Sequence, residues 1–239
     1  MGARPSSFQT PESPTIEWAW SLQQQAIFDW FTLSRKHETP NQLPMNLVVR
    51  ARAGTGKTTT IIEGVRRAPE DRPLLCAFNK RIADEMNGRL ENSRAAAKTL
   101  HSVGYAAIRR EWKGMPVADG TQRADWLTNQ VCSGSTPHQI KKLITLLHSK
   151  GRETVPLSPT TKVLTELALF FDYVPDESWV QYPLEWVVAR AQDAMRYATA
   201  NLPVYGVGID FADMVYLPLV WNLLSPDYDL VVVDECQDM

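Results

Sequence analysis

The residues best suited to chemistry in this sequence form a short run, ARAGTGKT, at positions 51–58. The run matches a phosphate-binding loop, AxxxxGKT, in which Ala51 stands where a first glycine is usual. Gly54 and Gly56 allow backbone N–H groups to turn toward a phosphate, at the positive end of the following helix. Lys57 is expected to reach the β- and γ-phosphates of a nucleotide, and the Thr58 hydroxyl to bind Mg²⁺. The residues expected to contact the nucleotide here are Ala51, Arg52, Ala53, Gly54, Thr55, Gly56, Lys57, Thr58 and Thr59.

A second reactive group lies at the other end of the sequence, directly after the apolar run LVVV. That run predicts a strand over 229–233, and Asp234 and Glu235 follow it. Two acidic residues at the carboxyl end of a strand are the usual partner of a phosphate loop. Asp234 is then expected to bind Mg²⁺, and Glu235 to orient or deprotonate a water molecule. A glycine-rich turn of no function would explain the loop alone, but it does not explain the acidic pair.

The loop needs a strand before it and a helix after it, and the sequence predicts both. Residues 47–49 form a short apolar run, which predicts a buried strand, and residues 59–65 predict a helix. Further strands are predicted over 72–80 and 95–100, with helices over 81–90 and from 101 onward. These alternating elements predict an α/β fold of the P-loop NTPase type, with a parallel sheet and helices on both faces.

A helix is predicted to begin at Ser21, within the stretch SLQQQ. Ser21 and Gln24 have the spacing of a capping box, in which each side chain bonds to the backbone of the other residue. Gln24 has a second possible role, because a glutamine at this place can also contact the adenine edge of ATP. The local pattern favours the capping role. Ile27, Trp30 and Phe31 follow with helical spacing and are expected to be core residues.

Polar and aromatic residues follow the two strands predicted after the loop. In open α/β sheets, residues just past the carboxyl ends of the strands line the binding face. Ligand contacts are therefore expected from Phe78, Asn79, Lys80, Thr99 and His101. A structural role remains open for two of them: Phe78 as a core aromatic, and His101 as a helix cap or core residue.

The middle of the sequence changes character. Residues 108–205 show helical periodicity broken by glycine and proline turns, with no clear strand, and predict an α-helical insertion between strands of the sheet. The predicted organisation is a flexible lead-in at 1–15, the first part of the α/β domain at 16–107, the insertion at 108–205, and the second part of the domain at 206–239. Four tryptophans of the inserted and flanking helices are expected to be core residues: Trp112, Trp126, Trp179 and Trp186.

Composition places limits on the class of protein. The 239 residues are 44% hydrophobic and 22% charged, which suits one large globular domain with an insertion. The sequence contains no apolar run of about 20 residues and no signal-peptide pattern, so no membrane contact and a cytoplasmic location are expected. Cys76 and Cys236 lie within or beside strand-like runs and are expected to be buried thiols, since no metal-ligand spacing is present.

Charge is distributed unevenly along the chain. Residues 1–113 contain 17 Lys and Arg against 11 Asp and Glu, whereas residues 114–239 contain 8 against 16. The basic half carries the phosphate loop and suits contact with a polyanion. The acidic half argues against a nucleic acid coating the whole surface.

From about Trp20 to the last residue, the order of motifs resembles the first RecA-like domain of superfamily 1 DNA helicases of the UvrD/Rep type. Within that group, the stretch AFNK more nearly resembles the F-box DNA helicase and phage-borne relatives. The resemblance implies an ATP-dependent 3′-to-5′ DNA helicase that uses Mg²⁺, with Gln24, or its neighbour Gln25, reading adenine. It also implies that Lys57, Glu235 and Gln237 are catalytic, the last within the DECQD box, where it senses the γ-phosphate. Single-stranded DNA would contact two segments, Phe78-Asn79-Lys80 and Thr99-Leu100-His101-Ser102.

Two features depart from the family's pattern. The aromatic residue before Asn79 lies one residue nearer to it than in the bacterial repair helicases. The sequence also stops at Met239, before the segment, the second RecA-like domain and the arginines with which the family continues. We therefore expect the amino-terminal piece of a longer helicase, which needs the missing domain for activity. The alternatives are a DNA-dependent ATPase or translocase that does not unwind, and a nucleotide-binding fragment without turnover.

Overall fold

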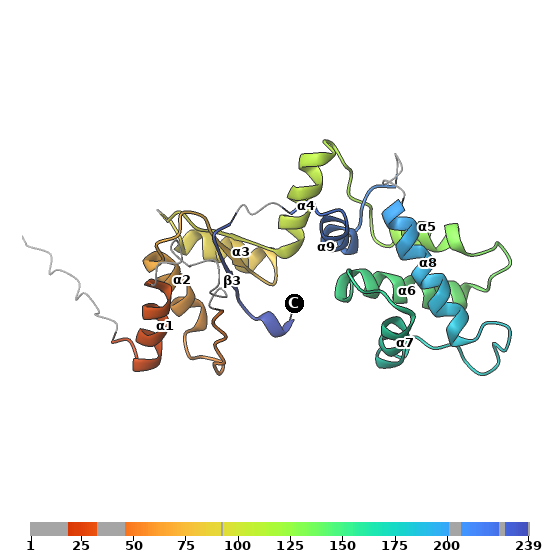
Figure 1. Cartoon of the computed structure of the whole chain (residues 1–239), viewed down its shortest axis with the longest axis horizontal. Coiled ribbons are helices and arrows are strands. Elements are labelled where there is room, and N and C mark those ends of the chain that lie inside the picture. The colour runs from red at the N-terminus through yellow and green to blue at the C-terminus, as the bar shows by residue number, and fades with distance from the viewer. Residues whose placement is uncertain (1–18, 33–45, 92, 201–206, 225–227, 239) are drawn as a thin grey trace, which may run out of the picture. The chain divides into compact units, whose positions relative to one another are not determined.

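The computed structural model describes residues 19–32, 46–91, 93–200, 207–224 and 228–238 (Figure 1). The chain divides into two compact units, residues 1–70 and residues 71–239. The phosphate loop belongs to the first unit. The sheet and the predicted insertion belong to the second. The predicted lead-in at 1–15 lies outside the described residues.

The first unit contains helices α1 (Leu22–Thr32) and α2 (Lys57–Arg67), which pack against each other. A Cβ atom built on Gly64 would come within 2.4 Å of the Phe31 ring, so the glycine allows the aromatic ring to lie on the α2 backbone. The buried Phe28 ring is contacted by the Arg67 guanidinium at 4.3 Å and edge-on by Trp20 at 5.0 Å. The predicted core position of Phe31 is confirmed. Ile27 and Trp30 are only partly buried.

The prediction of a buried strand at residues 47–49 was wrong for this structure. The described residues 46–50 belong to neither a strand nor a helix, and the Val48 side chain is 78% exposed. An apolar run identifies strand-forming residues, but a strand exists only where a second strand satisfies its backbone hydrogen bonds. The helix predicted to start at Thr59 begins two residues earlier, at Lys57.

The second unit is built on a three-stranded sheet. Strands β1 (Pro73–Cys76), β2 (Ala96–Lys98) and β3 (Leu230–Val233) lie in the order β2-β1-β3, and both pairs are parallel. β1 is fully buried, as expected of a central strand with a continuous apolar sequence. Helices α3 (Lys80–Arg89) and α4 (Leu100–Glu111) follow β1 and β2 directly. The α/β fold with a parallel sheet is confirmed.

Four helices make up the part of the predicted insertion that the structure describes: α5 (Gln122–Val131), α6 (His138–Thr154), α7 (Thr161–Phe170) and α8 (Leu184–Ala200). They share one apolar core, whose fully buried members include Leu127, Ile140, Ile144, Leu164 and Met195. Burying side chains of this size contributes about 1.5–3 kcal/mol each, which explains why the helices hold together without strands. The four tryptophans predicted as core residues pack against this core but stay partly exposed.

Helix α9 (Phe211–Val220) connects these helices to the sheet, because it packs against both α4 and α6. Its contact with α4 is unusually close. A Cβ atom on Gly104 of α4 would lie 1.7 Å from the carbonyl oxygen of Met214, so the two helix backbones touch where the side chain is absent. The chain enters α9 through a parallel bridge between Val117 and Ile209. Any larger residue at position 104 would separate the two helices.

Of the two cysteines predicted to be buried, one is buried and the other is exposed. Cys76 is buried in β1, as expected, and burial raises the pKa of its thiol. Cys236 is exposed instead of buried. β3 ends at Val233, and Cys236 lies beyond it in the 3₁₀ turn η1 (Cys236–Asp238), where its side chain faces solvent. Among the described helices, none is both long and apolar enough to span a bilayer.

Candidate functional site

The phosphate loop has the backbone that its sequence predicts. Gly54 and Gly56 have φ angles of 78° and 79°, in the left-handed region where glycine is favoured. Gly56 is the N-cap of α2, and no side chain caps the helix there. A Cβ atom on Gly54 would meet nothing within 4 Å. The Thr55 hydroxyl donates to the Arg52 carbonyl at 2.8 Å, and this hydrogen bond stabilises the turn. An open loop at an uncapped helix amino terminus fits a bound phosphate.

Gln24 lies beside this loop and also caps its own helix. Its Oε1 accepts from the Ser21 backbone N–H at 3.0 Å, and its own backbone N–H donates to the Ser21 hydroxyl at 3.2 Å, so the capping box is confirmed. Its Nε2 donates to the Thr60 hydroxyl at 2.8 Å. The sequence analysis missed Thr60, which donates in turn to the Gly56 carbonyl. Gln24 therefore links α1 to the first turn of α2, and its adenine contact stays a prediction.

The acidic residues lie at the carboxyl end of β3, as predicted. Asp234 is 7% exposed, and its backbone N–H donates to the Cys76 carbonyl at 3.1 Å, which continues the ladder between β3 and β1. Glu235 has a φ angle of 50°, a strained value for a residue other than glycine. The Gln237 side-chain amide donates to the Glu235 carboxylate. The turn thus brings two of the three predicted catalytic side chains, Glu235 and Gln237, into contact.

Phe78, Asn79 and Lys80 follow β1 at the same edge of the sheet. The Phe78 ring is 54% exposed, which excludes the core role that the sequence left open. Asn79 is the N-cap of α3, where its Oδ1 accepts from the Ile82 backbone N–H at 2.9 Å. Lys80 is exposed in the first turn of α3. An exposed ring and an exposed amine are thus placed together at the carboxyl end of the central strand.

Thr99, His101 and Ser102 occupy the start of α4, after the neighbouring strand β2. Thr99 is the N-cap, accepting from the Ser102 backbone N–H at 3.1 Å, and the Ser102 hydroxyl donates to the Thr99 carbonyl at 2.8 Å. His101 is neither the cap nor buried, so both structural roles left open for it are excluded. Its ring lies edge-on to the exposed Phe211 ring, with centroids 5.2 Å apart. Phe211 was not singled out by the sequence analysis, because its role depends on this contact between two helices.

The sheet register brings together the predicted residues that follow β1, β2 and β3. Cys76 in β1 pairs with Lys98 in β2 and with Val233 in β3, so the three strands end level with one another. The segments after these strands therefore emerge at one edge. They carry Phe78, Asn79, Lys80, Thr99, His101, Ser102, Asp234 and Glu235.

A family model described as an AAA domain matches residues 41–239, which is most of the chain. The chain belongs to the AAA domain family. A curated relative, the F-box DNA helicase protein 1 of Schizosaccharomyces pombe, is 24% identical over 211 residues, which cover 80% of this chain. The chain spans only 23% of that relative's length.

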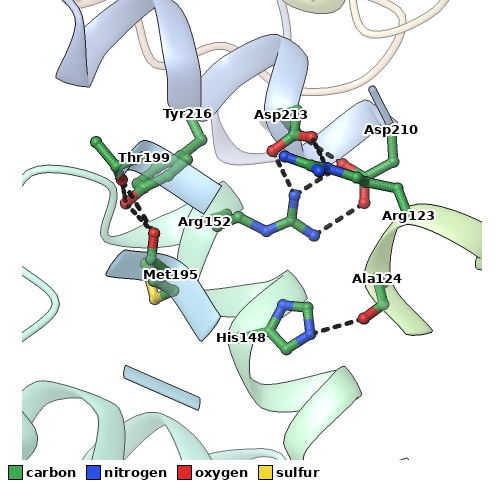
Figure 2. Close-up of polar contacts among 9 residues, drawn as sticks. All are labelled: Arg123, Ala124, His148, Arg152, Met195, Thr199, Asp210, Asp213 and Tyr216. Atoms are coloured by element: carbon green, nitrogen blue, oxygen red, sulfur yellow. Dashed lines mark hydrogen bonds and ion pairs between the residues drawn. The ribbon is translucent and has the colours of Figure 1, made fainter. Parts of the chain in front are cut away.

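This AAA domain also contains a buried cluster of charges that the sequence analysis missed (Figure 2). The guanidinium of Arg152 in α6 bonds to both carboxylate oxygens of Asp210, at 2.9 and 2.8 Å, and to Asp213 at 2.6 Å. Arg123 in α5 donates its Nε to the other oxygen of Asp213 at 2.8 Å. Both arginines are fully buried. The two positive charges balance the two negative ones within a single cluster.

The cluster has clear electrostatic consequences. Burial raises the pKa of Asp210, but the Arg152 charge and its hydrogen bonds outweigh this effect and lower the pKa overall. Burial likewise lowers the pKa of Arg152, but the charges and hydrogen bonds of the two aspartates raise it by more. The net pKa is therefore raised, and the guanidinium stays charged. Nη1 and Nη2 of Arg123 have no hydrogen-bond partner among the described residues, and its guanidinium lies 5.1 Å from the Trp126 ring. Arg123 is thus held by one ion pair and one aromatic face.

His148 in α6 is fully buried near this cluster (Figure 2). Its Nε2 lies 3.2 Å from the Ala124 carbonyl oxygen and 3.1 Å from the Thr128 hydroxyl. Because a carbonyl only accepts, Nε2 carries the proton of the neutral ring, and Nδ1 has no partner among the described residues. Burial, with the nearby Arg152 charge, lowers the pKa of His148 from 6.5 to about 3. The ring is therefore neutral in the folded protein.

Proposed function

We propose that this chain is the ATP-binding motor domain of an ATP-dependent DNA helicase of superfamily 1. The observation that carries the proposal is the level carboxyl edge of the sheet, where the strands that precede both predicted DNA segments and the acidic pair end together. Membership of the AAA domain family and an open phosphate loop support a nucleotide ligand. The name of the fission-yeast relative supports DNA as the second ligand.

The nucleotide side of the proposal assigns a role to each predicted residue. Lys57 would bind the β- and γ-phosphates, and Thr58 and Asp234 are the residues that the motifs assign to holding Mg²⁺. The ion would supply positive charge to balance the charge that develops on the transferred phosphoryl group. Glu235 accepts a proton from the attacking water. The charge balance supports this division, because the loop supplies a cation and the DECQD box supplies carboxylates.

Gln237 is proposed to link nucleotide state to DNA contact. Its amide holds the Glu235 carboxylate in the structure. A γ-phosphate that competes for this amide would free the carboxylate to act on water. The left-handed backbone of Glu235 supports a switching role, since strained residues persist where the surrounding structure holds them in a functional conformation.

The DNA side of the proposal rests on the exposed residues of the edge. The Phe78 ring is available to stack on a base, and Lys80 to contact a phosphate. The hydroxyls of Thr99 and Ser102 are committed to capping α4, so their contribution to DNA would come mainly through the backbone at the helix start. His101 adds a partly exposed polar ring to the second segment. Stacking and phosphate contacts together favour a single strand without strong sequence preference.

Two narrower activities remain distinct from unwinding: translocation along DNA without strand separation, and nucleotide binding without turnover. The 3′-to-5′ polarity is part of the proposal and rests on the resemblance of the motifs. A strand-displacement assay with tailed duplexes on the complete protein distinguishes unwinding in either direction from translocation.

Binding measurements on the chain itself test the proposal. Lys57→Ala should abolish binding of a fluorescent ATP analogue in the presence of Mg²⁺, whereas Lys162→Ala, which removes an exposed lysine from α7, should not. For DNA, Phe78→Ala should weaken binding of a labelled oligothymidine by about 1–3 kcal/mol, with an affinity that falls steeply with salt. Phe170→Ala is the matched control, because it removes an even more exposed ring from α7. Equal loss in each variant and its control would reject the proposed site.

A further inference from the structure

Arg123 and Arg152 come from the helical insertion, but the carboxylates that they bind belong to the start of α9. Arg152 presents a planar fork to Asp210 and also reaches Asp213, while Arg123 holds the second oxygen of Asp213 (Figure 2). Farther along α9, apolar contacts such as that with Met195 do not fix direction, but the Tyr216 hydroxyl donates to the Met195 carbonyl at 3.1 Å and lies 2.7 Å from the Thr199 hydroxyl. The ion pairs are therefore the directional contacts at the start of the helix, where Asp210 and Asp213 lie.

Asp210 also determines where α9 begins. It is the N-cap of the helix, and its Oδ1 accepts from the Asp213 backbone N–H at 2.8 Å while it binds Arg152. The next residue, Phe211, lies edge-on to His101. A rotation of α9 about its axis would therefore move the ring that contacts His101 in the first turn of α4.

The contact between α9 and α4 transmits such a change. The Met214 carbonyl lies so close to Gly104 that the two backbones cannot slide past each other without separating. Gly104 is only two residues from Ser102, whose backbone N–H is held by the Thr99 hydroxyl. A continuous path of contacts thus runs from the insertion, through α9, to the capped first turn of α4.

Stability alone does not explain a cluster of this kind. Buried ion pairs can often be replaced by apolar side chains of similar volume with no loss of stability, whereas their hydrogen bonds fix one arrangement. Here the arginines even leave three buried nitrogens without partners among the described residues: Nε of Arg152, and Nη1 and Nη2 of Arg123. The cluster is thus better suited to orienting α9 than to stabilising the core.

We infer that Arg123 and Arg152 are positioning residues: through Asp210 and Asp213 they orient α9 and so hold the first turn of α4 in place. Because Thr99 to Ser102 belong to the proposed DNA edge, the helical insertion controls the shape of that edge. This second statement rests on the proposed function, whereas the first does not.

A neutral variant separates positioning from stability. It combines Arg123→Met, Arg152→Met, Asp210→Ser and Asp213→Leu, so that volume and the N-cap are retained while every charge is removed. The control is Lys162→Gln with Glu166→Gln, which removes an exposed pair at 4.0 Å from α7. Hydrogen exchange is measured at the Ser102 and Val103 amides, which are both held by Thr99. Exchange there should accelerate by roughly 2- to 30-fold in the neutral variant, with melting temperature and exchange in α8 preserved.

Oligothymidine affinity is then measured on the same proteins and should fall by roughly 2- to 30-fold in the neutral variant only. Parental exchange at Ser102 and Val103 in a folded neutral variant would overturn the positioning role. If the parent binds no DNA, the proposed function fails, and the exchange data still decide the positioning role. If the neutral variant does not fold, Arg152→Lys replaces it, because lysine keeps the charge but loses the planar fork. Parental exchange in Arg152→Lys would likewise reject the inference.

Discussion

The buried neutral His148 predicts that the second unit loses stability as the pH falls from about 7.5 to about 5. In the unfolded chain the ring has an ordinary pKa near 6.5, whereas in the folded protein burial and the Arg152 charge lower it to about 3. The unfolded state therefore binds a proton in this range and the folded state does not. Stability is fully present above pH 6.5 and is lost progressively as the pH falls toward 3.

The size of the effect follows from these two pKa values. Proton linkage between about pH 7.5 and about pH 5 gives a loss of about 2 kcal/mol in the free energy of unfolding. Geometry supports the direction independently, because protonation would place a hydrogen on Nδ1, which has no acceptor among the described residues. Asp210 and Asp229, whose folded pKa values are lowered, lose their contributions only below the ordinary aspartate pKa near 3.9, so they do not contribute in this window.

The assay is denaturant unfolding at both pH values, followed by the fluorescence of tryptophans such as Trp126 that pack on the insertion core. His148→Gln is the comparison, since its amide can still donate to the Ala124 carbonyl but does not titrate. The parent should lose about 2 kcal/mol more than the variant between the two pH values. Exposed histidines affect both proteins alike and cancel. Equal losses in the two proteins would refute the buried neutral ring.

Two further predictions concern packing and the sheet. Gly104→Ala should destabilise the second unit by about 3 kcal/mol or more in the same unfolding assay, because the added Cβ meets the Met214 carbonyl at 1.7 Å. Gly88→Ala is the control, because a Cβ atom at this helical position would meet nothing within 4 Å, and it should stabilise the second unit by about 0.5–1 kcal/mol. A similar loss of stability in both variants would contradict the close contact at Gly104. Asp229→Asn should cost about 1 kcal/mol at neutral pH, because the Asp229 carboxylate accepts from two backbone N–H groups before β1, at 2.9 and 2.8 Å. Slight burial raises the Asp229 pKa, but those bonds outweigh it and lower the pKa overall. The difference in free energy of unfolding between the parent and Asp229→Asn should therefore shrink below about pH 4, where the carboxylate becomes protonated. A difference that does not change with pH would contradict this role of the carboxylate.

Local patterns in the sequence were enough to predict the parts of the site that lie within single segments. The glycines of the loop, the capping box of Ser21 and Gln24, and the acidic pair after β3 all depend on neighbours within a few residues. Such features follow from backbone preferences and short-range hydrogen bonds. The start of α2 was displaced by two residues, the usual uncertainty of a helix end.

Features that depend on distant pairing could not be predicted in this way. The apolar run at 47–49 has the composition of a strand, but its composition does not say whether a partner is present. The Arg152 and Asp213 pair spans 61 positions, and an arginine within an apolar helical stripe shows no partner in its own sequence. The one available signal was a charged residue at a core position, since burying an unpaired charge is costly. That signal predicts a partner but does not identify it.

The pairing of β1 with β3 has a consequence for how the chain folds during synthesis. Asp229 bonds to a residue 158 positions earlier, so β1 leaves the ribosome long before its second neighbour is made. At the usual rates of translation, the wait is about 10–30 s. Meanwhile the insertion helices can fold through local contacts, and their packing on α9 brings the two distant strands close, which reduces the entropy lost when the long loop closes. Until then the open side of β1 is an unpaired strand edge that another nascent chain could join, and an insertion that folds quickly shortens this exposure.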